Sequence, residues 1–142
     1  MGSLAKTLAK FATVGHTAVY RASKGKVAGR MGGHSVCLLT TTGRRSGQSR
    51  TVPLMSFPQA GELVVIASNG GSDRYPAWYH NIKEHPEVTV QIGEKVQKMT
   101  AREGTPQERA EIWPRVVAQA KNFGQYEKKT SRVIPVVVLT PR

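Results

Sequence analysis

The 142-residue sequence predicts an α+β fold in which six strands form a small β-barrel and a few helices are inserted between them. Two patterns support this prediction. Short runs rich in valine, isoleucine, leucine and threonine recur along the chain, and most connections between them have the length of hairpin turns. The length allows one domain with a single core, and no linker divides it. Residues 1–142 are therefore expected to fold as one domain.

The N-terminal part, residues 1–30, is predicted to be an amphipathic helical segment. Leu4, Leu8 and Phe11 fall at helical spacing, whereas Lys6 and Lys10 lie off that face. The apolar face of such a helix can pack against the domain, and this is the simpler interpretation. The alternative is a mobile segment that lies on a membrane surface.

Six strands follow in chain order, separated by residues that favour turns. A glycine- and arginine-rich turn separates the first two strands, residues 58–61 form the next turn, and Gly93 begins a third. Pro135 interrupts the last strand near its start. The predicted strands are residues 35–42, 49–57, 62–67, 88–92, 95–102 and 133–140.

Two helices are predicted between these strands. Pro76 suits the first turn of a short helix that runs to about His85. The sequence Thr105-Pro106-Gln107-Glu108 is a capping box with proline at the first helical position, which starts a second helix. Pro114 is expected to kink or divide that helix, and residues 121–132 are expected to be helical or looping.

The charge balance narrows the range of functions. Twenty-one lysines and arginines face nine acids, a net charge of +12 that attracts nucleic acid, an acidic membrane face or a phosphorylated small molecule. The acids are scattered, so two-carboxylate hydrolysis and oxygen-rich metal sites are poorly supported. No nucleic-acid-binding motif is visible, and the basic residues do not interleave with aromatics. An anionic small molecule is therefore the favoured ligand.

The single cysteine and the length of the apolar runs indicate where in the cell the protein is expected. Cys37 is the only cysteine and is expected to be a buried, inert thiol. No apolar run is long enough to span a bilayer, and the N-terminus lacks the pattern of a secretory signal. The cytoplasm is the expected location, with peripheral contact at the inner face of the membrane if residues 1–30 lie on that surface.

The first candidate binding segment is the arginine turn, residues 43–50. Arg44, Arg45 and Arg50 fall within these eight residues, and Ser46 adds a hydroxyl. Arginine forks bind phosphates and carboxylates with two hydrogen bonds at once. The turn is not a phosphate-binding P-loop, because Gln48 stands where that motif requires lysine. An ordinary solvated hairpin turn remains the alternative.

The second candidate is the junction segment, residues 68–81, which joins a strand to a helix. Gly70 and Gly71 permit positive φ or a close approach of the backbone to a ligand. Trp78 and Tyr79 offer flat apolar surfaces, although Trp78 alone is better explained as a core residue. Together with the arginine turn, this segment indicates a site for a flat, anionic molecule.

No side chain in the sequence stands out as a catalyst of its own. The four histidines lack the spacing and partners of a metal site, and no serine lies in a nucleophile-elbow sequence. Cys37 has no indicated base. Catalysis is therefore expected to depend on a bound cofactor, with no metal.

These motifs in combination resemble the actinobacterial deazaflavin-dependent nitroreductases, a family that includes quinone reductases. The resemblance implies a split β-barrel like that of FMN-binding reductases. It also implies an oxidoreductase that transfers hydride from reduced 8-hydroxy-5-deazaflavin, coenzyme F420, to quinones or other electron-poor acceptors such as nitro compounds and enones. The likeness covers about residues 35–142. It rests on residues 39–48, Arg50, 53–54, 68–71, 76–81, 101–102, 108–114 and 134–138.

The resemblance also implies site residues. The anionic part of the coenzyme would meet Arg44, Arg45, Ser46 and Arg50, beside Thr51, Val52, Pro53, Leu54 and Met55. The deazaflavin would be lined by Ile66, Ala67, Ser68 and Asn69, and its pocket closed by Ala77, Trp78, Tyr79, His80 and Asn81. Tyr126 matches a tyrosine of the substrate pocket. Backbone N–H groups, or the hydroxyls of Ser68 and Tyr126, are the candidates to stabilise the developing oxyanion of the acceptor.

Two positions depart from the nitroimidazole-activating member of that family. Asn69 stands in place of a lysine and Phe123 in place of a tyrosine, which argues against nitroimidazole activation. Three alternatives stay open: FMN in place of the deazaflavin, a non-catalytic barrel that stores a deazaflavin, flavin, haem or fatty acid, and a basic nucleic-acid-binding protein. A homodimer is a further expectation.

Overall fold

The computed structural model describes residues 30–31 and 34–142. The predicted N-terminal helical segment and its membrane contact fall on residues 1–30, which lie outside the described residues except for Arg30 in β1. The strands are β1 (Arg30–Met31), β2 (His34–Thr42), β3 (Ser49–Met55), β4 (Phe57–Gln59), β5 (Glu62–Ile66), β6 (Glu87–Ile92), β7 (Lys95–Glu103) and β8 (Val136–Pro141). The helices are the short 3₁₀ helix η1 (Asn69–Gly71), α2 (Ala77–Glu84), α3 (Pro106–Gln119) and α4 (Lys121–Lys129).

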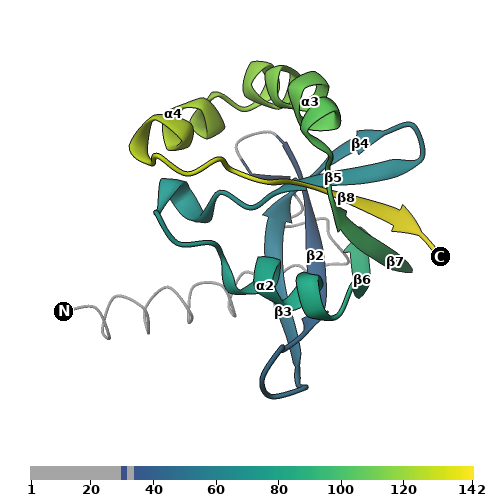
Figure 1. Cartoon of the computed structure of the whole chain (residues 1–142). Coiled ribbons are helices and arrows are strands. Elements are labelled where there is room, and N and C mark those ends of the chain that lie inside the picture. The colour runs from purple at the N-terminus through teal and green to yellow at the C-terminus, as the bar shows by residue number, and fades with distance from the viewer. Residues whose placement is uncertain (1–29, 32–33) are drawn as a thin grey trace.

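The strands form one curled antiparallel sheet. Its order is β3-β2-β6-β7-β8-β5-β4, and the short β1 adds to the beginning of β2. The outermost strands β3 and β4 are separated in the chain by Ser56 alone, so the two ends of the sheet are joined covalently and the sheet bends back on itself (Figure 1). The predicted α+β class is therefore confirmed.

The predicted number of six strands is wrong, since the described residues contain eight strand segments. One reason is β1. The other is Ser56, which divides the expected strand 49–57: its N–H still donates to the Ser35 carbonyl at 3.0 Å, but the next residue pairs with β5 instead. The expected turn 58–61 is shorter, because Ala60 and Gly61 alone turn the chain at φ +48° and +81°. Pro58 is tolerated because β4 lies at an edge.

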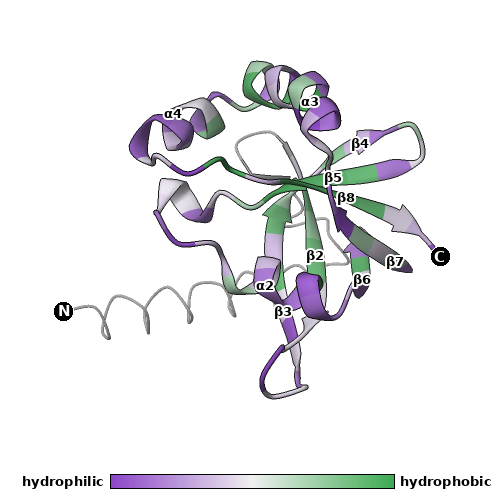
Figure 2. Ribbon diagram, in the orientation of Figure 1, coloured by the Kyte–Doolittle hydropathy of each residue, from purple (hydrophilic) through white to green (hydrophobic). Residues whose placement is uncertain are grey.

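Strand alternation sorts the apolar side chains into two layers. On β5, Leu63 and Val65 point into the curl of the sheet, whereas Val64 and Ile66 point to its outer face, under α3 and α4. Figure 2 shows the apolar stretches of these central strands, and Figure 1 shows α3 and α4 on one side of the sheet. Cys37 is fully buried in the inner layer, and burial raises its pKa to about 12. The prediction of a buried thiol is confirmed.

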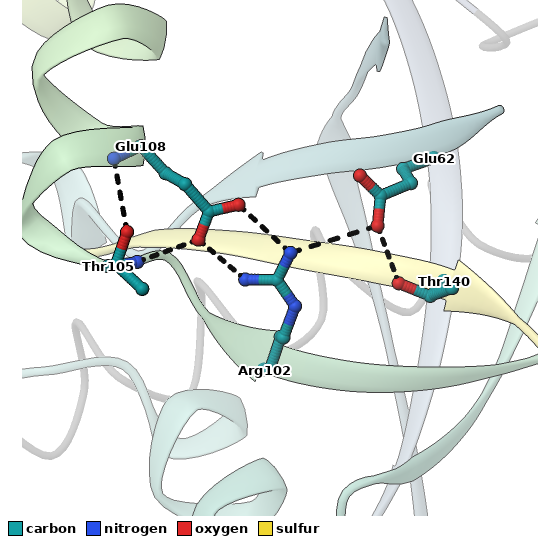
Figure 3. A network of polar contacts seen from close by, with 5 residues as sticks. All are labelled: Glu62, Arg102, Thr105, Glu108 and Thr140. Atoms are coloured by element: carbon teal, nitrogen blue, oxygen red, sulfur yellow. Dashed lines mark hydrogen bonds and ion pairs between the residues drawn. The ribbon is translucent and has the colours of Figure 1, made fainter. Parts of the chain in front are cut away.

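A network of charged side chains fastens α3 to the sheet, as Figure 3 shows. The predicted capping box is present, with Thr105 N–H donating to Glu108 at 2.9 Å and Glu108 N–H donating to the Thr105 hydroxyl at 3.2 Å. Arg102 on β7 donates to both carboxylate oxygens of Glu108, at 2.7 and 2.9 Å, and lies 3.8 Å from Glu62 on β5. Thr140 on β8 donates to Glu62 at 2.8 Å. Three strands thus hold the start of one helix.

The expected division of this helix at Pro114 is wrong, because α3 continues to Gln119. Pro114 and Ala110, four residues earlier, are both exposed, so water can satisfy the carbonyl that loses its helical donor. The break comes instead at Ala120, whose φ of −138° separates α3 from α4. Among the described residues, no helix has the length and apolar character needed to cross a bilayer.

Candidate functional site

The arginine turn is the hairpin between β2 and β3. Gly43 N–H donates to the Gln48 carbonyl at 2.8 Å, and Gly47 takes φ +71° to close the turn. Arg45 and Arg50 are exposed and Arg44 is half-buried. Within the described residues, none of these three guanidinium groups has a carboxylate at ion-pair distance, whereas Arg102, Arg109 and Arg142 all do. The turn therefore carries positive charge that an anion can use.

A hydrogen bond connects the arginine turn to the junction segment. The buried Asn81 of α2 accepts from the backbone N–H of Arg44 at 3.0 Å and donates to the Thr41 hydroxyl at 3.0 Å. Both ends of its amide are thereby satisfied, as burial requires. The family resemblance implied that Asn81 closes the coenzyme pocket. Its side chain joins α2 to the start of the arginine turn.

The two large aromatics of α2 are part of the inner core. Trp78 and Tyr79 are 6% and 8% exposed and pack with the inward residues of the strands. The Tyr79 hydroxyl donates to Glu103 at the end of β7, and Lys83 lies 3.0 Å from the same carboxylate. Burial and the bond to Glu103 raise the pKa of Tyr79. These contacts hold α2 rigidly against the sheet.

A small aromatic cluster extends from α2 toward solvent. Tyr75 stacks on Tyr79 with ring centroids 4.8 Å apart, and His80 meets both rings edge-on. Burial, followed by the nearby charge of Arg44, lowers the pKa of His80 below 6.5. The neutral imidazole is therefore the form that the site holds at neutral pH.

The η1 loop, residues 67–75, is the second half of the site. Asn69, Gly70 and Gly71 all take positive φ, between +46° and +85°. The Asn69 side chain donates to the Arg74 carbonyl at 3.1 Å, inside the loop itself. A Cβ on Gly70 would face open space, which leaves room for a ligand, whereas a Cβ on Gly71 would strike the backbone of Tyr126 at 2.9 Å. Both glycines thus take the positive φ that was predicted for them, and the close neighbour of Gly71 is α4.

Tyr126 lies half-buried on α4, beside the η1 loop. Its ring meets Phe123 edge-on at 5.8 Å, and Phe123 in turn meets Phe57 at 6.0 Å. Tyr126 packs in the outer layer with Met55 and Ile66, two residues also predicted at the site. The structure therefore brings Met55, Ile66 and Tyr126 together on the outer face of the sheet.

The remaining predicted residues lie on β3 or next to β5. Thr51 to Met55 are half-buried on β3, with Val52 and Leu54 facing the inner core and Thr51 sharing a 2.8 Å hydroxyl contact with Thr40. Ala67 is buried in the inner layer and Ser68 is buried beside it. Ala77 and Ser46 are exposed. The predicted residues thus fall on both faces of the sheet.

One residue of the site was missed by the sequence reasoning. Arg132, between α4 and β8, donates from Nε to the Ser72 carbonyl at 2.8 Å and from one terminal nitrogen to the Ser68 carbonyl at 2.8 Å. Its guanidinium carbon lies 4.6 Å from the centre of the Tyr75 ring. All these partners are backbone or aromatic groups about sixty positions earlier, so no charge pattern in the sequence could indicate them.

Comparison with known proteins identifies relatives across most of the chain. The sequence model of the F420H(2)-dependent quinone reductase family matches residues 13–141. An F420H(2)-dependent quinone reductase of Mycobacterium tuberculosis is 38% identical over 131 residues, covering 89% of this chain and 88% of that protein.

Solved structures lead to the same group. A structure described as an F420-H2 dependent reductase (FDR-A) is 42% identical, covers 73% of this chain and 92% of its own, and has a TM-score of 0.68. A structure described as a domain-swapped dimer is 37% identical over 89% of this chain and 96% of its own, with a TM-score of 0.70.

More distant structures show likeness of fold alone. A FAD-binding protein of Mesorhizobium loti is 14% identical with a TM-score of 0.54, covering 75% of this chain and 78% of that one. The near matches confirm the resemblance inferred from the motifs, including the deazaflavin coenzyme and oxidoreductase chemistry. On these grounds the chain belongs to the F420H(2)-dependent quinone reductase family.

Proposed function

We propose that this chain reduces quinones with reduced coenzyme F420 at a site formed by the arginine turn, the junction segment and Tyr126. The observation that carries this proposal is the hydrogen bond from Arg44 N–H to Asn81 at 3.0 Å. It joins the arginine turn directly to the aromatic helix, although 37 positions separate the two residues in the sequence. The other end of that helix adjoins the η1 loop, because Tyr75 stacks on Tyr79.

The residues present suit the chemistry of the coenzyme. Its phosphodiester and oligoglutamate tail are anionic, and Arg44, Arg45 and Arg50 have no carboxylate partner among the described residues. Forked guanidinium groups are well matched to such oxygens. The open space beside Gly70 leaves room for a flat ring near the backbone. When bound, the coenzyme supplies a hydride from C5.

The side chains of the chain then align the acceptor and stabilise charge. Trp78 and Tyr79 are anchored in the core, so this wall of the site keeps its shape when a ligand enters. Ser68 and Tyr126 carry the hydroxyls proposed to donate to the developing oxyanion of a quinone or enone. No acid or base with a strongly displaced pKa is needed, because the hydride donor is the coenzyme.

Quinones are the proposed acceptors in preference to nitroimidazoles. The Asn69 amide is neutral and is already engaged with the Arg74 carbonyl. Phe123 is buried between Phe57 and Tyr126, so it offers packing and no hydroxyl. Nitro compounds are therefore expected to react slowly, as adventitious substrates.

The proposal extends to the architecture and assembly. The closure of the curled sheet through Ser56 supports a split β-barrel, and a homologue described as a domain-swapped dimer supports a homodimer. The proposed location is the cytoplasm, with contact at the inner face of the membrane through residues 1–30 as the alternative to packing of that segment against the domain. Sedimentation with anionic vesicles, compared between the full chain and a chain lacking residues 1–29, tests that contact.

Steady-state oxidation of the reduced coenzyme with menadione tests the proposed function. We expect saturable turnover with menadione and little with a nitroimidazole, together with tight binding of the coenzyme in a spectral titration. Binding without turnover would indicate a storage protein. Tight binding of FMN without binding of the deazaflavin would overturn the cofactor, and salt-sensitive DNA binding unaffected by the coenzyme would favour a nucleic-acid-binding protein.

A further inference from the structure

Arg132 binds the η1 loop through almost its whole guanidinium group. Besides the bonds to Ser72 and Ser68, it donates to the Ala67 carbonyl at 3.3 Å and to the Arg74 carbonyl at 3.3 Å. Four of its five N–H donors thus reach backbone oxygens of a single loop. Figure 1 shows the segment between α4 and β8 passing beside this loop.

The loop needs such support because its backbone is strained. Asn69 has φ +46°, which is uncommon for a residue with a Cβ, and two glycines in the same region follow it. Conformations of this kind persist where the surroundings hold them. The short η1 helix supplies few bonds of its own, namely Gly71 N–H to the Ser68 carbonyl and Ser72 N–H to the Asn69 carbonyl.

Two further contacts link the same two segments. Thr130 donates to the Asp73 carboxylate at 2.6 Å, and Gly71 lies against the backbone of Tyr126. Residues 126–132 therefore contact the η1 loop near its start, at Ala67 and Ser68, and near its end, at Asp73 and Arg74. If α4 moved away from the η1 loop to admit the acceptor, the bonds of Arg132 to the carbonyls of Ala67 and Ser68 would lengthen.

We infer that Arg132 is a positioning residue that sets the η1 loop against α4, and so fixes Ser68 relative to Tyr126 when coenzyme and acceptor bind. This inference rests on the proposed function, because it takes those two residues as walls of the reaction site. Positioning the η1 loop in this way requires the planar, forked guanidinium group of arginine. A lysine keeps the charge, but its compact ammonium cannot reach four carbonyls spread over residues 67–74.

The chain offers a matched control in Arg109. It is also half-buried, donates from Nε to a backbone carbonyl, that of Ile134, at 2.9 Å, and lies 4.6 Å from the ring centre of Trp113. Its contacts are on α3, α4 and the segment before β8, with none on the η1 loop. Arg109→Lys and Arg132→Lys therefore remove similar contacts in different places.

The first test is hydrogen–deuterium exchange of the full-length protein without ligand. In Arg132→Lys we expect the amides of residues 69–72 to exchange about tenfold faster than in the wild type, since hydrogen bonds to a charged group are lost. Arg109→Lys should leave those amides unchanged. Thr130→Val removes the link to Asp73 and should accelerate the same amides to a smaller extent, which gives a second probe if Arg132→Lys does not fold.

The second test uses reduced coenzyme F420 and menadione. Arg132→Lys should raise the Kd for the coenzyme roughly threefold to tenfold and lower kcat for menadione by about threefold to tenfold, because Ser68 is no longer held in place relative to Tyr126. Equal exchange and equal Kd in Arg132→Lys and wild type would overturn the inference, as would equal effects of Arg109→Lys. If the wild type itself shows no turnover, the proposed function fails, while the exchange experiment still decides the role of Arg132.

Discussion

Gly71 lies so close to Tyr126 that a Cβ at this glycine would come within 2.9 Å of the Tyr126 carbonyl oxygen and 3.0 Å of its Cα. The η1 loop and α4 therefore touch through their backbones. Because backbone atoms cannot rotate away as a side chain can, any group larger than hydrogen at position 71 must push α4 outward.

Gly71→Ala tests this contact. The left-handed conformation costs a residue with a Cβ about 1–2 kcal/mol, and the clash with α4 adds roughly 1–3 kcal/mol. We expect a loss of free energy of unfolding of about 2 kcal/mol or more in urea, and a higher KM for menadione. Gly70→Ala is the control, since it has φ +64° with open space at the Cβ and should show the conformational cost alone. An equal loss of free energy of unfolding in Gly71→Ala and Gly70→Ala would contradict the contact between Gly71 and Tyr126.

Asn81→Ala should release the arginine turn. The variant leaves the Arg44 N–H and the Thr41 hydroxyl without their partner, which costs roughly 1–3 kcal/mol of stability. It should also weaken coenzyme binding, because the turn loses its fixed position against α2. Gln91→Ala removes a side-chain bond to the Gly93 carbonyl in another hairpin and should leave the Kd unchanged. Unchanged coenzyme affinity in Asn81→Ala would contradict the proposal that Asn81 positions the arginine turn for coenzyme binding.

Arg45→Gln tests anion binding by the turn. Loss of one charge-assisted contact should raise the Kd for the coenzyme by about fivefold to twentyfold at low salt, and the difference from the wild type should shrink as salt rises. Arg115→Gln removes an arginine of α3 that is also exposed and controls for net charge. The turn would be an ordinary solvated hairpin if both variants bound the coenzyme like the wild type.

Tyr126→Phe keeps the packing of the ring against Phe123 and removes the hydroxyl. If this hydroxyl donates to the developing oxyanion, kcat for menadione should fall by about tenfold to a hundredfold with little change in coenzyme Kd. Tyr75→Phe is the comparison, because Tyr75 also lies at the site but makes its contact with Tyr79 through its ring. Unchanged turnover of every acceptor in Tyr126→Phe would remove Tyr126 from this role.

The network around Glu108 predicts the response of the fold to acid. Hydrogen bonding from Arg102, then from the Thr105 backbone, lowers the pKa of Glu108 from 4.5 to about 2. A pKa lowered by folding contributes stability that is present above pH 4.5 and is lost as the pH falls toward 2. Thermal unfolding of wild type and Glu108→Gln should therefore differ at pH 6 and converge near pH 2.

The same network provides an internal check on that prediction. Arg102→Gln removes the main cause of the lowered pKa, so its pH profile should resemble that of Glu108→Gln. In the double variant the loss of stability should be smaller than the sum of the two single losses, because the two residues share one ion pair. A wild-type advantage that persists unchanged at pH 2 would contradict the assigned cause.

Local signals in the sequence predicted much of this structure. The capping box at Thr105, the apolar run of β5 and the position of α2 after Pro76 all depend on residues within a few positions of one another. The division at Pro114 was wrong because the exposure of one helix face, which lets water satisfy the freed carbonyl, is a tertiary property. The break at Ser56 likewise depends on which strand comes to lie beside β4.

The candidate site was predictable in composition but not in its connections. The arginine turn and the aromatic helix stood out by residue type. The bonds that organise them join distant positions, such as Arg44 with Asn81, Tyr79 with Glu103, and Arg132 with the η1 loop. Such pairs are decided by closure of the sheet, and no short-range pattern encodes them.

The order of the strands also determines when the fold can form. β8 (residues 136–141) lies between β7 and β5, so it supplies hydrogen bonds to both sides of the sheet. β5 pairs with it across 70 to 76 positions, from Ile66 with Val136 to Leu63 with Leu139. Pairing over such separations is slow. On the ribosome, the edges of β5 and β7 that face β8 therefore stay unpaired until residues 136–141 emerge, and unpaired strand edges favour aggregation.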